Sequence, residues 1–293
     1  MCSNEEGCGP DAMRRAILAG SVGLAVASLS GPALGQSPQA PAAAPTPPAA
    51  PPPTRVLDDP RALHGPVTFS HNGQPGIGGY LARPRADGIY PAVVVIAGNR
   101  ISEEYIPNTC AALALAGYVG LAPDIFHILP DSAQTLDAMR AAGANHTDSD
   151  VLNDIQAGIE YLRAQSFVRR GGIGSLGFCY GGRMAMLLGA RSREVDAVVA
   201  YHPGPVTAEE IARLSVPVQI HCGTADRNVS LEQIRALEAM LTAQHTPTEL
   251  HLYDGADHGF LAYTRPPRYN PAAGILSWQR TIAFLSRTLS SAG

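Results

Sequence analysis

The chain has no excess of basic residues, no internal repeat and no C-x-x-C pair. Each absence makes some classes of function less expected. Its 21 Lys and Arg residues are outnumbered by 25 Asp and Glu residues, which gives a net charge of −4. A nucleic-acid-binding face is normally strongly basic, so no nucleic acid partner is expected. The missing C-x-x-C pair speaks against a redox dithiol, and no Cys–His spacing matches a zinc site. We therefore expect neither a metal nor a cofactor.

Cysteine is scarce, with five residues in 293. Cys2 and Cys8 lie near the N-terminus, while Cys110 and Cys222 fall in apolar runs that predict a helix and a strand end. We interpret Cys110 and Cys222 as small buried hydrophobic residues. The fifth, Cys179, lies in a different setting, and a disulfide through it would block the role described below.

An unbroken apolar run of about 20 residues, as a transmembrane helix needs, is also lacking. The apolar stretch Ala16–Leu29 is interrupted by Gly and Ser, follows Arg14-Arg15 and precedes the small-x-small sequence Ala33-Leu34-Gly35. This pattern predicts that residues 1–35 are an export signal resembling the twin-arginine type. The protein is then expected to be periplasmic or secreted, without stable membrane insertion once the signal is cleaved. An uncleaved anchor is the alternative.

Residues 36–55 form a second segment, rich in Pro and Ala, with eight prolines between Ser37 and Thr54. Such a composition buries no core and predicts an extended, disordered linker. Residues 56–293 then form one domain. With 45% apolar residues overall, the chain has ample material for a packed core.

Strand-like and helix-like runs alternate through this domain, which predicts an α/β fold with a mostly parallel central sheet and helices on both faces. Strands are expected near residues 67–70, 80–83, 92–96, 119–121, 172–176, 197–201, 216–221 and 249–253. Helices are expected near residues 106–116, 150–164, 180–190, 231–243 and 272–289. The irregular segment from Phe126 to Thr147 is our candidate for a lid or specificity segment.

The most informative motif is Gly177-Phe178-Cys179-Tyr180-Gly181-Gly182, between a strand-like and a helix-like run. It matches the G-x-S-x-G nucleophile elbow of α/β-hydrolases with Cys in place of Ser. The tight turn requires small residues two before and two after the nucleophile, where Gly177 and Gly181 stand. A helix N-terminus favours the thiolate form of Cys179. The alternative for this motif alone is a turn with a structural cysteine.

Two residues downstream complete a catalytic triad in the chain order of that fold, nucleophile, acid, His. Asp226 follows the predicted strand 216–221, and His258 follows the strand 249–253. Cys179 would attack the acyl carbon, His258 would transfer the proton, and Asp226 would orient the imidazole. Asp254 and Asp257 are rival acids, ranked second because neighbours of the His in a short loop usually point elsewhere.

Several motifs together resemble the dienelactone hydrolase (carboxymethylenebutenolidase) family. The similar segments are Gly177–Arg183, Leu115–Asp124, Asp257–Phe260, Arg268–Ala273 and Trp278–Thr281. The resemblance covers roughly Val67 to Leu289 and implies an α/β-hydrolase fold and hydrolysis of esters or lactones, without a cofactor, by a Cys-Asp-His triad. Residue by residue, that triad falls on Cys179, Asp226 and His258.

The chain departs from the family pattern after the strand 92–96. The family usually carries His-Glu there, and the Glu restrains the resting thiol; here Gly98 occupies the Glu position. Glu103 or Glu104 could replace the missing family Glu only if the chain folded back toward Cys179. We expect these two residues to begin a helix instead. Cys179 should then pair directly with His258, and Gly98→Glu should restore the family pairing.

The substrate-binding arginines of the founding enzyme are also missing from their expected places. Ile125–Ile128 follows Pro123-Asp124 where one is expected, and Ala262 stands where the other is expected. Arg265, Arg100 and Arg183 are nearby but do not match the pattern. We therefore do not expect dienelactone to be the substrate, and whether the substrate is anionic stays open.

The remaining site candidates surround the triad. The oxyanion hole should use the backbone N–H groups of Tyr180 and Asn99. Arg100, His202 and Phe260 are candidate substrate-binding residues, although a polar turn residue is the simpler interpretation of His202.

These observations favour an exported cysteine-dependent ester or lactone hydrolase, acting on a small molecule as a monomer or small homo-oligomer. The alternative is a non-catalytic ligand-binding protein on a hydrolase scaffold, which the loss of Glu at Gly98 supports. A peroxide-reactive thiol protein is a third hypothesis, without a resolving cysteine to support it.

Overall fold

The computed structural model describes residues 54–70, 76–99, 102–130, 132–133, 141 and 145–290. The chain divides after residue 45, and every described residue belongs to the unit formed by residues 46–293. The predicted signal, nearly all of the predicted linker, and Arg100 lie outside the described residues. Within the described part, no helix combines the length and apolar character needed to cross a membrane.

One eight-stranded sheet organises the described residues, with strand order β1-β2-β4-β3-β5-β6-β7-β8. The strands from β4 through β8 along this order are parallel, whereas β2 runs antiparallel to both β1 and β4. The strand bounds are Ala62–Phe69 (β1), Ile77–Pro84 (β2), Tyr90–Ile96 (β3), Val119–Pro123 (β4), Val168–Phe178 (β5), Val195–Tyr201 (β6), Val218–Gly223 (β7) and Thr248–Tyr253 (β8). The prediction of a mostly parallel sheet is confirmed.

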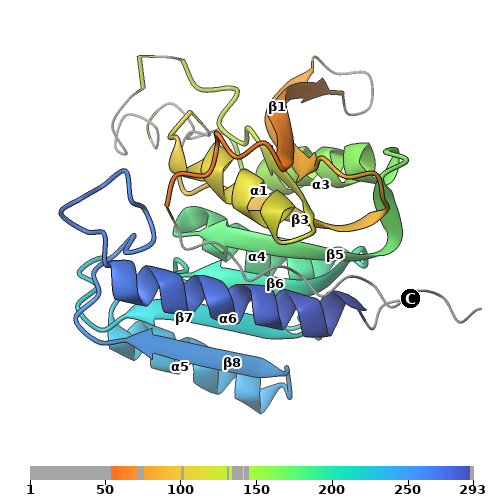
Figure 1. Ribbon diagram of the computed structural model, residues 1–293. Coiled ribbons are helices and arrows are strands. Elements are labelled where there is room, and N and C mark those ends of the chain that lie inside the picture. The colour runs from red at the N-terminus through yellow and green to blue at the C-terminus, as the bar shows by residue number, and fades with distance from the viewer. Residues whose placement is uncertain are drawn as a thin grey trace, which may run out of the picture. The chain divides into compact units, whose positions relative to one another are not determined.

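Helices cover both faces of this sheet (Figure 1). Helices α1 and α6 pack on one face, and α3, α4 and α5 pack on the other. The helix bounds are Tyr105–Leu115 (α1), Asp148–Arg163 (α3), Tyr180–Arg191 (α4), Leu231–Ala243 (α5) and Pro271–Ser290 (α6). Thr147 and Ser230 form capping boxes at the starts of α3 and α5, which fixes where those two helices begin.

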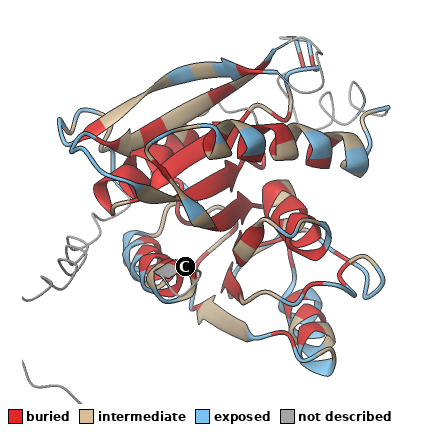
Figure 2. Ribbon diagram, turned by 90° about the vertical axis from the view of Figure 1, so that its right-hand side faces the viewer, coloured by how far each residue is buried: buried red, intermediate tan, exposed pale blue. Residues whose placement is uncertain are grey.

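The core lies on the central strands and on the sides of the helices that face them, as Figure 2 shows. All seven residues from Gly172 to Phe178 are buried, so this part of β5 is a continuous buried run. Parallel strands covered on both faces produce this pattern. Because mostly apolar side chains fill such strands, with Ser175 as the polar exception in this run, the candidate functional groups lie in the loops at the carboxyl ends of the strands.

The register brings these carboxyl ends together. Phe178 at the end of β5 pairs with Tyr201 at the end of β6, and Tyr201 in turn pairs with His221 in β7. Gly223 at the end of β7 pairs with Tyr253 at the end of β8. The loops that follow β5, β6, β7 and β8 therefore meet at one edge, where ligands bind in open α/β sheets.

Candidate active site

Cys179 occupies a strained turn between β5 and α4, with φ 55° and ψ −115°. A left-handed conformation is costly for a residue with a side chain and is kept only where the surroundings enforce it. The surroundings here are backbone: a Cβ on Gly177 would come within 2.0 Å of the Gly181 oxygen, and one on Gly181 within 2.1 Å of the Ile96 oxygen. The two glycines are therefore required for the turn, and the predicted elbow is present.

The position of Cys179 is fixed by hydrogen bonds to neighbouring loops. Its N–H donates to the Tyr201 oxygen at 3.0 Å, and its carbonyl accepts from the Arg183 N–H and the Gly204 N–H, each at 3.1 Å. Cys179 is also the N-cap residue of α4 and makes no capping bond with its side chain. The sulfur is thus free to take part in chemistry at a helix N-terminus.

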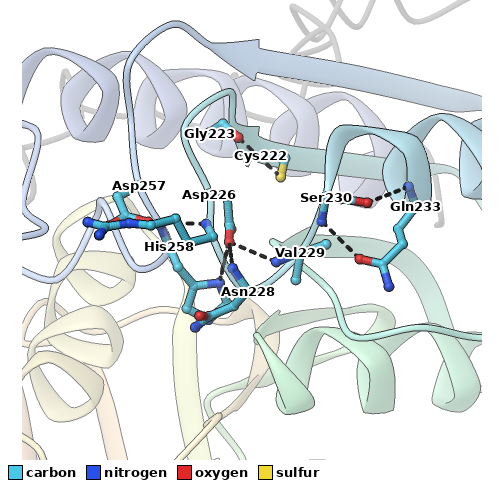
Figure 3. A network of polar contacts seen from close by, with 10 residues as sticks. Cys222, Gly223, Asp226, Asn228, Val229, Ser230, Gln233, Asp257 and His258 are labelled. Atoms are coloured by element: carbon cyan, nitrogen blue, oxygen red, sulfur yellow. Dashed lines mark hydrogen bonds and ion pairs between the residues drawn. The ribbon is translucent and has the colours of Figure 1, made fainter.

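Asp226 and His258 meet although 32 residues separate them in sequence. His258 Nδ1 lies 2.9 Å from Asp226 Oδ2 and 3.2 Å from Oδ1. Figure 3 shows the Asp226 carboxylate between the His258 ring and the N–H groups of Asn228 and Val229, which donate to Oδ1 at 2.8 and 2.9 Å. A carboxylate held by three donors fixes both the orientation and the tautomer of the imidazole.

The same imidazole is hydrogen-bonded to the Cys179 sulfur. Because Nδ1 is taken by Asp226, the bond to Cys179 uses Nε2. The described residues thus form a continuous chain of contacts from Asp226 through His258 to Cys179. This is the arrangement that the chain order predicted.

The electrostatic interactions among Asp226, His258 and Cys179 favour a thiolate–imidazolium pair. Burial raises the pKa of the Cys179 thiol. The hydrogen bond and charge of His258, together with the Tyr180 N–H, lower this pKa by more than burial raises it, so the thiol pKa lies below its ordinary value. Burial lowers the pKa of His258, but its hydrogen bonds to Asp226 and Cys179 outweigh burial and raise it to about 9. The pKa of Asp226 is lowered on balance, since bonds from His258 and the backbone N–H groups overcome the effect of burial.

This balance predicts the pH dependence of Cys179 alkylation. The thiolate is the reactive form, so the iodoacetamide rate rises with pH through the Cys179 pKa, and we expect the midpoint below the ordinary thiol value of 9.0. In His258→Gln the hydrogen bond and charge are lost while burial remains, so the midpoint should move to higher pH. The rate is followed by mass spectrometry of the peptide containing Cys179.

His245→Gln is the matched control for this experiment, because His245 is an exposed histidine that does not line the cavity. Its midpoint should equal that of the parent protein. An identical midpoint in His258→Gln would contradict the thiolate–imidazolium pair.

The rival acids are held elsewhere. Asp257 Oδ2 accepts from the Arg227 guanidinium at 2.9 Å, and Asp257 Oδ1 accepts from the His258 N–H at 2.7 Å. Asp254 Oδ1 accepts from the Thr224 hydroxyl at 3.1 Å. Neither contacts the His258 ring, so the ranking of Asp226 first agrees with the geometry.

The two expected oxyanion-hole residues both line the cavity over Cys179. The Tyr180 N–H is directed at the Cys179 sulfur, which is one cause of the lowered thiol pKa. Asn99 follows β3, and its side-chain amide donates to Glu103 Oε1 at 3.0 Å. Tyr180 is the first residue of α4 and Asn99 follows β3, so the two residues reach the cavity from different elements.

Gly98 lies directly against the nucleophile, and this corrects one expectation. A Cβ at this position would come within 2.6 Å of the Phe178 oxygen and 3.0 Å of Cys179 Cβ. Gly98→Glu therefore cannot restore a pairing with Cys179 unless the backbone moves. Glu103 does not substitute for the missing carboxylate, because it is bound by Asn99 and by Arg265.

A cavity of about 660 Å³ opens above the triad. Cys179 and His258 lie on its wall, and the described part of the segment 126–147 contributes Phe126, Ile128, Leu129 and His146. This agrees with the interpretation of that segment as a specificity element. The other lining residues are Gly98, Asn99, Ser102, Glu103, Tyr105, Ile125, Val151, Phe178, Tyr180, His202, Asn228, Gly259, Leu261, Ala262, Arg265 and Arg268.

The remaining sequence candidates had different outcomes. His202 does line the cavity, whereas Phe260 is fully buried, packs against Tyr201 and Tyr253, and is not among the lining residues. The expectation that Phe260 contacts substrate is thus corrected: the short turn after His258 directs it into the core. Cys110 and Cys222 are buried free cysteines, as predicted.

Sequence reasoning missed one group at the cavity rim. Arg265 Nη2 lies 2.5 and 2.6 Å from the two oxygens of Glu103, so its positive charge is paired. Arg268 also lines the cavity. Arg265 was noted only as failing to match a family position, and no sequence pattern pairs it with a glutamate 162 residues away.

The fold and the elbow define an α/β-hydrolase, and comparison with known proteins gives the family. A model of the dienelactone hydrolase family matches residues 77–289. The chain belongs to the dienelactone hydrolase family, and ester or lactone hydrolysis is the activity of that family.

Individual relatives agree with this assignment. The chain is 30% identical over 233 residues to a Bradyrhizobium protein named "Probable 2-oxo-3-(5-oxofuran-2-ylidene)propanoate lactonase", covering 75% of this chain and 92% of the relative. It is 29% identical over 220 residues to a candidate carboxymethylenebutenolidase from Synechocystis, with coverages of 70% and 89%. A crystal structure of a candidate dienelactone hydrolase from Klebsiella pneumoniae superposes with a TM-score of 0.71 at 25% identity, covering 77% of this chain and 99% of that one.

Proposed function

We propose that the protein is an exported, cysteine-dependent ester or lactone hydrolase that forms an acyl-enzyme on Cys179. The observation that carries this proposal is the contact chain Asp226–His258–Cys179, which ends at a cavity of about 660 Å³. Ligand binding alone does not require a strained elbow or a thiol paired with an oriented imidazole, whereas nucleophilic catalysis in this fold uses both.

The first half of the reaction forms a thioester. The Cys179 thiolate attacks the carbonyl carbon, and the developing oxyanion accepts hydrogen bonds from the N–H groups of Tyr180 and Asn99. When the C–O bond to the leaving alcohol breaks, the His258 imidazolium donates its proton to the leaving oxygen. In a lactone the leaving alcohol remains attached to the acyl group.

The second half releases the product. Neutral His258 takes a proton from a water molecule, whose oxygen attacks the thioester carbon. The tetrahedral species collapses with Cys179 leaving as thiolate, and the protonated His258 is again stabilised by Asp226. One water is consumed, one acid and one alcohol group are formed, and the resting ion pair is restored.

The test is to trap the acyl-enzyme. The full chain is mixed with p-nitrophenyl acetate, quenched in acid within the first turnover and analysed by peptide mass spectrometry. We expect a burst of p-nitrophenol and an acetyl group on the Cys179 peptide. Steady turnover without an adduct on Cys179, or no turnover on a panel of short p-nitrophenyl esters, a neutral lactone and a dienelactone, would overturn the proposal. The second result would favour the ligand-binding alternative.

The rim arginine suggests which substrates are preferred. Because the Arg265 charge is paired with Glu103, we expect neutral esters or lactones to be hydrolysed at least as efficiently as anionic ones. Glu103→Gln removes the negative charge and leaves Arg265 unpaired. The ratio of kcat/KM for an anionic lactone to that for a neutral one should rise about two- to fivefold, as expected for a partly exposed charge pair.

Glu104→Gln is the matched control, because Glu104 is the next residue and pairs with Tyr263 and Arg55 instead. Its substrate ratio should equal that of the parent protein. A ratio that does not move in Glu103→Gln would show that Arg265 does not sense substrate charge.

The export part of the proposal rests on residues 1–35. The paired arginines, the apolar stretch and the small-x-small sequence support cleavage before Gln36. Expression in a bacterium with an active twin-arginine pathway should give an exported protein whose N-terminus is Gln36. Arg14→Lys combined with Arg15→Lys should retain it inside the cell, and export of that variant would contradict the twin-arginine route.

A further inference from the structure

We propose that the active-site pocket binds one Zn²⁺-class cation through Cys179, His202 and His258, and that this binding is exclusive with acyl transfer. One ligand atom from each of the three side chains lies within 4.8 Å of the others. The proposal is independent of the proposed hydrolysis, because the cation can be detected whether or not any ester is turned over.

The spacing suits a tetrahedral cation. Zinc bonds of about 2.3 Å to sulfur and about 2.0 Å to nitrogen place neighbouring ligand atoms about 3.5 Å apart. The observed upper limit of 4.8 Å is therefore within about 1.3 Å of that spacing, a distance that small side-chain rotations cover. Thiolate and imidazole are the ligands that Zn²⁺ and related metals prefer, whereas Mg²⁺ and Ca²⁺ prefer oxygen.

His202 lies outside the triad and supplies the third potential metal ligand beside Cys179 and His258. It follows β6 with φ 38°, its side chain is buried, and its ring centroid lies 4.1 Å from that of His258. Its Nδ1 is buried and has no hydrogen-bond partner among the described residues. A buried polar nitrogen without a partner is costly, and coordination of a ligand at this ring offers compensation.

Two further features match known metal sites. His258 Nδ1 is hydrogen-bonded to Asp226, which leaves Nε2 for the cation and reproduces the carboxylate–histidine–zinc arrangement. The three ligands also line a cavity, so the fourth tetrahedral position faces open space. Structural zinc sites use four protein ligands, whereas three protein ligands with one open position leave room for a water molecule.

The bound cation would block hydrolysis. It occupies the sulfur lone pair that attacks the acyl carbon, and it occupies the His258 nitrogen that carries the proton. The metal-bound and acyl-transfer states thus use the same two atoms and exclude each other. Zn²⁺ should act as a reversible inhibitor, relieved by a chelator.

The experiment is a Co²⁺ and Zn²⁺ titration of the full chain carrying Cys2→Ser and Cys8→Ser, so that the two N-terminal thiols do not compete. We expect one Co²⁺ per chain with a thiolate-to-cobalt absorption in the near ultraviolet, displaced by Zn²⁺ but not by Mg²⁺. His202→Gln should weaken binding at least about tenfold. His245→Gln, the same change at an exposed position that also has positive φ, should leave the affinity unchanged.

Two results would overturn the proposal: the absence of a thiolate–cobalt band in the parent protein, or equal affinity in His202→Gln and the parent. If His202→Gln fails to fold, X-ray absorption of the Zn²⁺-loaded parent decides. One sulfur at about 2.3 Å with two imidazole nitrogens at about 2.0 Å supports the site. One sulfur with a single imidazole overturns it, because His202 is then not a ligand.

Discussion

Replacing Cys179 with alanine is expected to lower kcat/KM for a p-nitrophenyl ester by at least about 10³-fold, because Cys179 is the group that His258 and Asp226 are arranged to activate. The loss should appear mainly in kcat, since the cavity that binds the substrate is unchanged. The oxyanion-hole N–H groups remain, so a small residual rate above water is expected. Steady-state kinetics on the purified full chain measure the effect.

Cys110→Ala is the control for this substitution. Cys110 is a free, fully buried cysteine in α1 and does not line the cavity. It should keep kcat/KM within about threefold of the parent, as expected for a small change outside the site. A Cys179→Ala variant that retains more than a tenth of the parental kcat/KM would contradict the role of Cys179 as nucleophile.

Gly177→Ala is expected to lower the free energy of unfolding by about 3 kcal/mol or more, the upper range for overpacking. The added Cβ would lie 2.0 Å from the Gly181 oxygen and 2.7 Å from the Gly182 nitrogen, both of them backbone atoms that cannot rotate away. The turn would have to open, which would also move Cys179 away from His258. Urea denaturation and the kcat of the folded fraction measure the two effects.

Gly78→Ala provides the comparison. Gly78 lies in β2, and a Cβ there has no atom within 4 Å. Its effect should remain within about 1 kcal/mol, in line with ordinary substitutions. Should Gly177→Ala yield no soluble protein while Gly78→Ala does, the prediction holds in its strongest form. Equal stability of the two variants would contradict the steric account of the elbow.

The alternating pattern of the sequence predicted most of the fold. Strand 92–96 was recognised from five consecutive apolar residues, and α5 was predicted at its observed bounds, Leu231–Ala243, because Ser230 marks its start. Errors fell at strand ends: β5 begins at Val168, four residues before the predicted start. The start of this strand was not recognised because Arg169 and Arg170 are polar. A strand segment outside the core no longer has an apolar pattern.

The candidate triad was also readable from the sequence, for a local reason. An elbow needs small residues at fixed offsets from the nucleophile, so Gly177 and Gly181 identify Cys179 without any tertiary information. Asp226 and His258 each follow a recognisable strand, and the chain order of the fold then assigns their roles. Phe260, two residues past His258, shows the limit of this reasoning, because sequence proximity does not say whether a side chain faces the cavity or the core.

What the sequence determined by itself is therefore everything encoded in short spacings: the alternating elements, the elbow around Cys179 and the order of its partners. What only the tertiary structure decided are contacts between residues far apart in the chain. The Glu103–Arg265 pair, the lack of room at Gly98 and the position of His202 beside Cys179 and His258 all arise at the carboxyl ends of different strands. The register of the sheet sets those distances, and register depends on packing over the whole domain rather than on any local pattern.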